Sequence, residues 1–265
     1  KLSPAAMGHP LSRRATLVGA LGGSMAYLAL EACTARADAG PLFAVCRVHP
    51  LEGAGVAQVG GSGAVAAGPA LPDRGHGICL RPGGTEAAVF ARRPGTFAAA
   101  FEPASGLVRH RFDTPPGRHF YGHGVFEPTG RLLFATENDV EAGRGVLGVY
   151  DAADGYRRVG ELDSFGVGPH DITLLPDGRT AAVANGGILT RPETGRAKLN
   201  LDSMRPSLAY LELDSGRLLE ERQLAPGLRQ LSIRHLALGR SGLLAAGMQW
   251  EGPAGARAPL LALDR

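Results

Sequence analysis

The chain has 265 residues, of which 44% are hydrophobic and 20% are charged. Its formal net charge at pH 7 is +3, and residues 1–39 hold four of the 28 basic and two of the 25 acidic residues, so the remainder is close to neutral. A chain of this length can bury one sizeable core. The balanced charge excludes the basic field that a nucleic acid or an anionic membrane surface would require.

Residues 1–39 have the features of an export signal. Arg13 and Arg14 precede a moderately apolar run, residues 18–30, and residues 37–39 read Ala-Asp-Ala, as in a signal-peptidase site. The run is too short to span a bilayer, which takes roughly 20 helical residues. Paired arginines before a glycine-rich run resemble a twin-arginine signal. We therefore expect a signal peptide at 1–39 and an exported, periplasmic domain without a membrane span at 40–265. A structural N-terminal helix and a lipid anchor at Cys33 are the alternatives.

One short pattern recurs along the rest of the chain. A histidine enters an apolar run that a glycine-bearing turn closes seven or eight residues later. The pattern starts at His76, His123, His170 and His235, with spacings of 47, 47 and 65 residues. A repeat of roughly 40–50 residues is typical of propeller blades with four strands each.

The apolar stretches between these points are short, and turn signals separate them every 8–12 residues, which is the pattern of an all-β protein. We predict a β-propeller of four-stranded blades, with units that begin near residues 41, 75, 122, 169 and 233. An insertion at residues 186–206 accounts for the longer last spacing. The fifth unit reaches residue 265 inside a strand, so we expect about five blades here of a seven-bladed ring that is incomplete at the C-terminus.

In a propeller the inner strand of each blade lines a central channel, so equivalent repeat positions become neighbours around the axis. The four histidines are therefore expected to form a partial ring at one end of the channel. Converging imidazoles could bind a transition metal ion such as Fe, Cu or Zn as a cofactor. The alternative is that each histidine only hydrogen-bonds a neighbouring blade and serves packing.

Two further groups of polar residues are candidates for ligand binding. The first group follows the second strand of the third unit or holds the equivalent place in the fourth, and the alternative for it is a solvated acidic turn. The second group lies in the insertion, and the alternative for it is a flap over a blade face. The first group is Glu137, Asn138, Asp139, Arg144 and Asn185, and the second is Arg196, Lys198 and Asn200.

Other chemistries find little support. Cys46 and Cys79 form no CxxC motif, and they could either pair in an oxidising compartment or serve as small buried residues. Alternation along a strand places His170 and Asp171 on opposite faces, which argues against a catalytic dyad. Ser232 lies outside any G-x-S-x-G motif, and the phosphate-binding GxxxxGK[ST] motif is absent from the sequence.

Several short motifs occur in a set order: Arg118–Gly124, Thr136–Asp139, Gly143–Val146, Tyr150–Tyr156, Gly168–His170, Ala184–Gly187, Gly195–Asn200, Pro206–Leu208 and Ser232–His235. Together they resemble one exported bacterial family, called domain of unknown function 1513. The likeness covers about residues 70–265, together with the leader. The resemblance implies a propeller with lactonase-like or YVTN-type repeats and a periplasmic location. It also implies partners among periplasmic iron-uptake proteins, and it implies no established activity.

Two functions are consistent with these features. The first is a periplasmic binding or scaffold protein of unknown ligand, linked to iron acquisition. The second is a metal-dependent propeller enzyme, a lactonase-like hydrolase or an oxidoreductase, with the metal held by the histidines and Glu137 or Asp139. Metal content separates the two hypotheses, because the enzyme requires a bound ion.

Overall fold

The computed structural model describes residues 25–26, 43–60, 63–195, 197–255 and 260–264. The expected export signal, its cleavage site and Cys33 therefore lie outside the described residues, apart from positions 25–26. Within the described ranges no helix has the length and apolarity needed to cross a bilayer. The described helical pieces are short 3-10 turns, and the rest of the regular structure is β-strand.

The strands form five small antiparallel sheets, each built from strands consecutive in the chain. Blade 1 contains β1 (Met25–Ala26), β2 (Phe43–His49), β3 (Gly53–Val59) and β4 (Val65–Ala70). Blade 2 contains β5 (Gly75–Leu80), β6 (Ala87–Ala91), β7 (Phe97–Phe101) and β8 (Val108–Asp113). Blade 3 contains β9 (Arg118–Phe126), β10 (Leu132–Asp139), β11 (Arg144–Asp151) and β12 (Arg157–Asp163). Blade 4 contains β13 (Pro169–Leu174), β14 (Thr180–Asn185), β15 (Ser207–Glu212) and β16 (Arg217–Gln223). Blade 5 contains β17 (Leu231–Leu238), β18 (Leu244–Trp250) and β19 (Leu261–Asp264).

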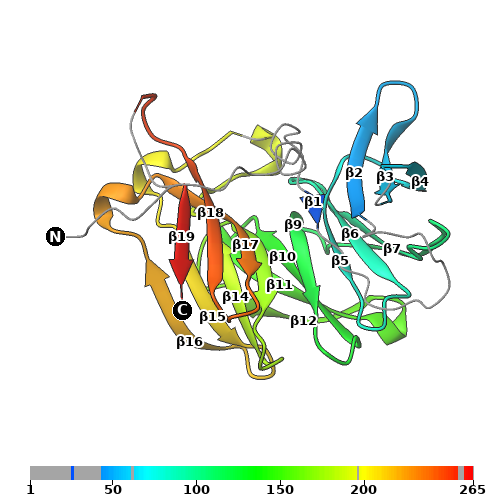
Figure 1. The fold of residues 1–265 in the computed structure, drawn as a ribbon. Coiled ribbons are helices and arrows are strands. Elements are labelled where there is room, and N and C mark those ends of the chain that lie inside the picture. Colours follow the sequence, from blue (N-terminus) through cyan, green and yellow to red (C-terminus); the bar gives the residue numbers. More distant parts are fainter. Residues whose placement is uncertain (1–24, 27–42, 61–62, 196, 256–259, 265) are drawn as a thin grey trace, which may run out of the picture.

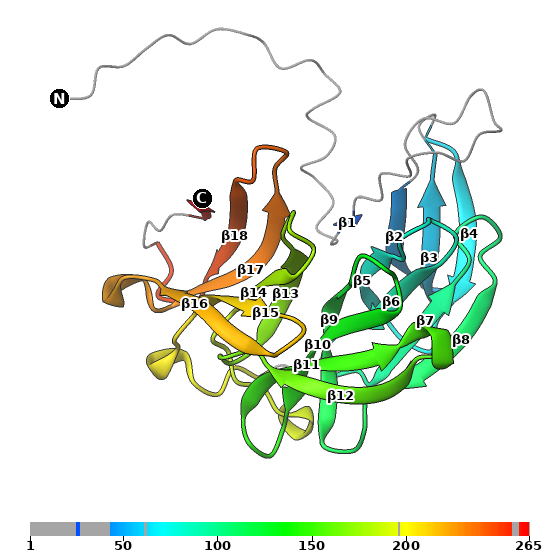
Figure 2. The same ribbon diagram turned by 90° about the horizontal axis from the view of Figure 1, so that it is seen from below.

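The five sheets are arranged as blades around one axis, with β5, β9, β13 and β17 innermost (Figures 1 and 2). The predicted fold, an all-β propeller with five blades in this chain, is thus confirmed. In Figure 2 the blades form an arc that is open between β17 and blade 1. The insertion carries the 3-10 turns Pro192–Thr194 and Leu201–Ser203.

The hydrophobic core lies between neighbouring blades. The middle strands of a blade are buried on both faces, so β6 and β7 read as continuous small and apolar residues, AAVFA and FAAAF. The outer strands β8 and β16 are largely exposed, β12 is partly exposed, and all three carry charged residues. Aromatic packing concentrates between blades 2 and 3, where the rings of Phe112 and Tyr156 stack with centroids 4.7 Å apart. Burial at these interfaces holds the inner strands at fixed angles around the axis.

Both described cysteines are free thiols. Cys46 packs against the hydrophobic cluster between blades 1 and 2, and Cys79 against the cluster between blades 2 and 3. Burial raises the pKa of the Cys46 thiol to about 12 and raises that of Cys79 as well. The structure thus shows two partly buried free thiols packed against apolar clusters, and no disulfide between them.

Candidate metal centre at the propeller axis

A β-bulge interrupts each inner strand close to its histidine. In each blade the pairing register between the first and second strands shifts near the histidine. The shift lies between Gly75 and Ile78 in β5, and in β9 it lies opposite residues Ala135 and Glu137 of β10. It lies between Pro169 and Asp171 in β13, and between Ile233 and His235 in β17. A bulge suspends the strict alternation of side chains and redirects the residue beside it. Each blade thus has a bulge beside its histidine, but the position differs: His170 is itself the unpaired residue in β13, whereas in β17 Arg234 is unpaired and His235 pairs with Gly247.

The four predicted histidines form a single cluster, which we call the imidazole cluster: His76, His123, His170 and His235. The shortest centroid separations are 4.8 Å, for His76–His123 and for His170–His235. The longest is 6.2 Å, for His76–His235. Ligand nitrogens of His76, His123 and His170 all lie within 4.8 Å of one another. Residues 159 positions apart in the chain thus meet at one point.

Two glycines make this close approach feasible. A Cβ at Gly77 would lie 2.3 Å from the Gly122 carbonyl oxygen and 2.9 Å from His123 Nδ1. Gly122 has a φ of +112°, and a Cβ there would lie 2.5 Å from His76 Cδ2. Any side chain at Gly77 would separate β5 from β9 and move the rings apart.

Asp171 belongs to the cluster and was missed by the sequence analysis. Its Oδ1 lies 3.2 Å from His123 Nδ1 and its Oδ2 lies 3.9 Å from His235 Nδ1. Backbone N–H groups of Ile172 and Leu236 also donate to this carboxylate, at 2.8 and 2.9 Å. Alternation placed Asp171 on the face away from His170, but the bulge brings both side chains to the cluster. Asp171 contacts His123 and His235 of the neighbouring blades. Asp171 and His170 therefore have different partners, although they are adjacent in sequence.

Two imidazole nitrogens have no hydrogen-bond partner among the described residues. They are His123 Nε2 and His170 Nδ1, and both are buried. On His123 the contact of Nδ1 with Asp171 places the ring proton on Nδ1 and leaves Nε2 as a lone-pair donor. This carboxylate–histidine arrangement is the one that orients histidine ligands in metal sites.

Burial keeps the imidazoles neutral. It lowers the pKa of His123 to about 3 and that of His76 to about 2, with the neighbouring imidazoles adding to the effect. The pKa of His170 is well below, and that of His235 below, the ordinary value for the same principal reason. Burial also raises the pKa of Asp171 to about 6. Neutral imidazoles are the form that binds metal ions.

The free energy of unfolding of the metal-free protein is expected to fall steeply as the pH drops below about 6.5. There the imidazoles of the unfolded chain take up protons, while those of His76, His123 and His170 in the folded cluster do not. Each such histidine costs roughly 1.4 kcal/mol per pH unit. Asp171 acts in the opposite sense between about pH 6 and 3.8, since its raised pKa lets the folded state bind a proton there.

Denaturant unfolding at pH 7.5, 6.0 and 5.0 measures this dependence. At pH 5 the cluster predicts a net uptake of about two protons on unfolding, three by His76, His123 and His170 less one by Asp171. The variant with His123→Gln and His170→Gln should give a flatter curve. An unfolding free energy that is the same at all three pH values would contradict the assigned protonation.

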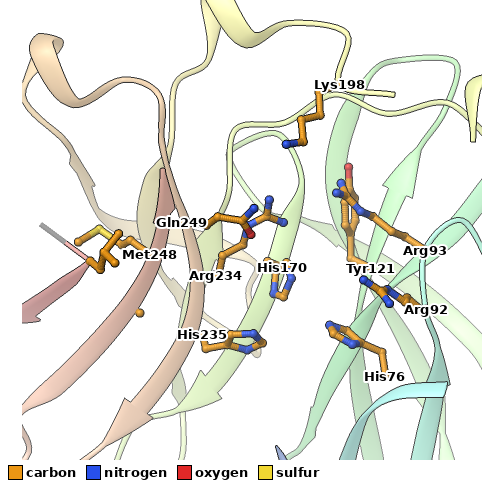
Figure 3. A pocket seen from close by; sticks show the side chains of 12 residues that line it. His76, Arg92, Arg93, Tyr121, His170, Lys198, Arg234, His235, Met248 and Gln249 are labelled. Atoms are coloured by element: carbon orange, nitrogen blue, oxygen red, sulfur yellow. The ribbon is translucent and has the colours of Figure 1, made fainter. Parts of the chain in front are cut away.

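A cavity of about 560 Å³ opens directly on the cluster. His76, His170 and His235 line one part of it, and Lys198, Arg93 and Tyr121 line another part farther from His235 (Figure 3). His123 is not among the lining residues, so it sits behind the other three. The cluster therefore has one side towards the cavity and another closed by Asp171.

Glu137, Asp139 and Arg144 are engaged within blade 3. Glu137 accepts from the Tyr150 hydroxyl at 2.6 Å and pairs with Arg158 at 3.0 Å. Asp139 pairs with Arg118 at 3.0 Å and with Arg144 at 3.5 Å, and Arg144 also reaches Glu161 and Asp163. None of the three is among the described residues that line the cavity.

The predicted amide residues hold backbone in place. Asn138 donates to His119 Nε2 at 3.1 Å and to the Thr190 carbonyl at 3.3 Å, and Asn185 donates to the Ser164 carbonyl at 2.8 Å. Asn200 bridges the insertion by accepting from Leu189 N and donating to the Gly187 carbonyl. Lys198 alone of the insertion candidates lines the cavity, and Arg196 lies outside the described residues.

Comparison with known proteins supports the fold. A solved structure titled Kuenenia stuttgartiensis Hydrazine Synthase is similar, with a TM-score of 0.58 and 15% sequence identity; the match covers 78% of this chain and 55% of that chain. The chain thus spans about half the length of that structure, and a likeness at this identity shows the fold alone. No curated protein matches the sequence. The family profile described as "Protein of unknown function (DUF1513)" matches residues 69–265, almost three quarters of the sequence, and the chain therefore belongs to the DUF1513 family.

Proposed function

We propose that this propeller binds one transition metal ion in the imidazole cluster and serves as a metal-binding protein. The observation that carries this proposal is the pair of buried nitrogens on His123 and His170 that lack partners among the described residues. A buried polar atom without a partner costs about 1–3 kcal/mol. Histidines that served packing alone would use these nitrogens in hydrogen bonds to a neighbouring blade, whereas a metal ion offsets the cost on both at once.

The donor set limits the type of ion. Neutral imidazole suits Zn, Cu, Fe and Ni, whereas Mg and Ca prefer oxygen ligands. Around zinc, nitrogens at about 2.0–2.1 Å lie roughly 3.4 Å apart in a tetrahedron. The nitrogens of His76, His123 and His170 lie within 4.8 Å of one another, so small ring rotations would bring them to bonding distance.

Equilibrium dialysis of the metal-free protein against Zn²⁺ and Co²⁺ tests the proposal. One ion per chain is expected, and tetrahedral Co²⁺ should give intense visible absorption. If the protein takes up neither ion beyond the weak non-specific binding expected of a protein surface without histidines, the proposal is refuted. Iron belongs to the same ligand class, and Fe²⁺ measured without oxygen tests the link to iron acquisition that we propose for this protein.

Asp171→Asn is expected to weaken Zn²⁺ binding by roughly 10–100-fold without changing the stoichiometry. The amide cannot accept the His123 Nδ1 proton with the strength of a carboxylate, so Nε2 becomes a poorer ligand. The visible spectrum of the Co²⁺ form should shift, which a purely structural role would not produce. Asp214→Asn is the control, because Asp214 is an exposed acid in a surface turn. Equal affinities for the two variants would remove Asp171 from the site.

A metal-dependent enzyme is the second candidate. The observation that favours it is the cavity, which gives a substrate access to an ion held by the inner histidines. The zinc-loaded protein can be assayed against a panel of lactones. Turnover that disappears with His123→Gln and His170→Gln would favour the enzyme, and metal binding without turnover would favour the binding protein.

We also propose that the protein acts in the periplasm. The support is the leader, with Arg13 and Arg14 before an apolar run and Ala-Asp-Ala at residues 37–39. A twin-arginine route would let the cytoplasm load the ion before export, because that route carries folded proteins. Fractionation of cells that express the chain with and without Arg13→Lys and Arg14→Lys tests the location.

A further inference from the structure

The wall of the cavity above the imidazole cluster is strongly cationic. Four of its lining residues carry positive charge, Arg92, Arg93, Lys198 and Arg234, and none of the described residues that line it is acidic. Of these four residues, only Lys198 was predicted from the sequence as a candidate for ligand binding. A site that received a bare metal cation would be expected to present carboxylates at its entrance. This entrance presents the opposite charge.

The arginines come from different blades and face one space. Arg92 and Arg93 follow β6 in blade 2, whereas Arg234 lies on β17 in blade 5, and Figure 3 shows them on opposite sides of the cavity. Lys198 approaches from the insertion in blade 4. A molecule in this space would be contacted by cations from both sides, which is the arrangement that suits more than one anionic group.

Two of these guanidinium groups are held in place before any ligand binds. Arg93 and Arg234 are each only 8% exposed. The Arg93 guanidinium lies 5.8 Å from the centroid of the Tyr121 ring, and the Tyr121 hydroxyl donates to the Ile188 carbonyl. Arg234 pairs with Glu251 at 2.9 Å, and Lys198 pairs with the same carboxylate. Glu251 thus fixes the positions of two of the four cations in the wall.

The cavity volume of about 560 Å³ falls in the usual range for small-molecule sites, roughly 300–1,000 Å³. Arginine matches the planar, two-oxygen geometry of a carboxylate. Gln249 adds an amide to the wall beside Arg234 (Figure 3). Size, charge and donor type together indicate an organic anion with several carboxylates.

We propose that this cavity binds a small polycarboxylate directly above the imidazole cluster. The site depends on the cavity alone and does not require a bound metal. Where the cluster holds an ion, which rests on the proposed function, a carboxylate in the cavity reaches the open side formed by His76, His170 and His235. The natural cargo would then be a metal ion with an anionic chelator.

Isothermal titration of citrate into the metal-free protein tests this site, with inorganic phosphate as the second probe. Citrate is expected to bind at one site per chain and at least tenfold more tightly than phosphate, and to weaken as NaCl rises. The double variant with Arg92→Gln and Lys198→Gln should lose at least tenfold in citrate affinity. These two residues are chosen because neither is fully buried, so the variant is expected to fold.

The matched control is Arg109→Gln with Arg157→Gln, which removes the same charge from exposed positions on β8 and β12. It should change citrate affinity less than twofold. Equal losses in the two double variants would mean non-specific attraction and would overturn the site. Phosphate binding as tight as citrate would overturn the polycarboxylate assignment. Because both probes are measured without metal, their failure leaves zinc binding to be judged by its own titration.

Discussion

Replacing His123 and His170 together by glutamine is expected to lower Zn²⁺ affinity by roughly a thousandfold or more, about 4 kcal/mol. These two side chains carry the buried nitrogens that lack partners among the described residues. Removing both leaves His76 and His235, whose ring centroids are the farthest apart in the cluster, at 6.2 Å. Two imidazoles supply only half of the four ligands of a tetrahedral zinc site. Competition with a chromophoric zinc chelator measures the affinity.

The control for that variant is His49→Gln with His110→Gln. Both residues are exposed, on β2 and β8, and lie outside the cluster. Zinc affinity and stoichiometry should be unchanged in the control, and near-ultraviolet circular dichroism should show both proteins folded. If the cluster variant binds zinc as the wild type does, or the control loses binding equally, the ion is held elsewhere.

Gly77→Ala is expected to destabilise the fold by about 3 kcal/mol or more, which is the range of severe overpacking. The new Cβ would lie 2.3 Å from the Gly122 carbonyl oxygen, and backbone cannot rotate away as a side chain can. Relief requires β5 and β9 to separate, and these strands carry His76 and His123. The same substitution should therefore also weaken zinc binding. Denaturant unfolding measures the first effect and zinc competition the second.

Gly160→Ala is the matched control for that substitution. Gly160 lies on the outer strand β12, an added Cβ would have no described atom within 4 Å, and its φ is in the range open to alanine. Its stability should change by less than about 1 kcal/mol, and a small gain is expected from the stiffer unfolded chain. A Gly77→Ala protein as stable as this control would show that β5 and β9 are not in close contact.

The sequence predicted the cluster because residues at equal intervals along the chain occupy equivalent positions in successive propeller blades. Spacings of 47 residues place His76, His123 and His170 at one position in successive blades. The insertion at 186–206 explains why His235 joins them after 65. The repeat alone predicts that the four imidazoles lie close together, and their centroid separations of 4.8 to 6.2 Å confirm this.

The parts of the site that were missed depend on local geometry that the repeat does not encode. Asp171 was placed on the wrong face because alternation was assumed where a bulge interrupts it. A bulge beside each histidine carries no residue signature that a single sequence reveals. Arg234 directly precedes His235, and that adjacency was the available signal for the cationic wall. Arg92 and Arg93 had no comparable signal, since only the loop after β6 brings them to the cavity.

The polar residues of blade 3 illustrate the opposite outcome. Glu137, Asp139 and Arg144 follow a strand at a loop, where ligand sites are common. Their charges are taken up by Arg158, Arg118 and Glu161 in the same blade. Sequence alone could not distinguish the two cases, because the partners lie on β9 and β12 and become neighbours only once the sheet has formed.

Anomalous diffraction at the zinc absorption edge, from crystals of the protein loaded with one equivalent of Zn²⁺, tests the central claim most directly. We predict one peak per chain at the axis, about 2.0–2.2 Å from nitrogens of at least three of the four cluster histidines. His123 Nε2 should be one of them, with Asp171 still on Nδ1. A peak only at surface histidines such as His49, or an axis without one, would contradict the assignment of the imidazole cluster as a metal centre.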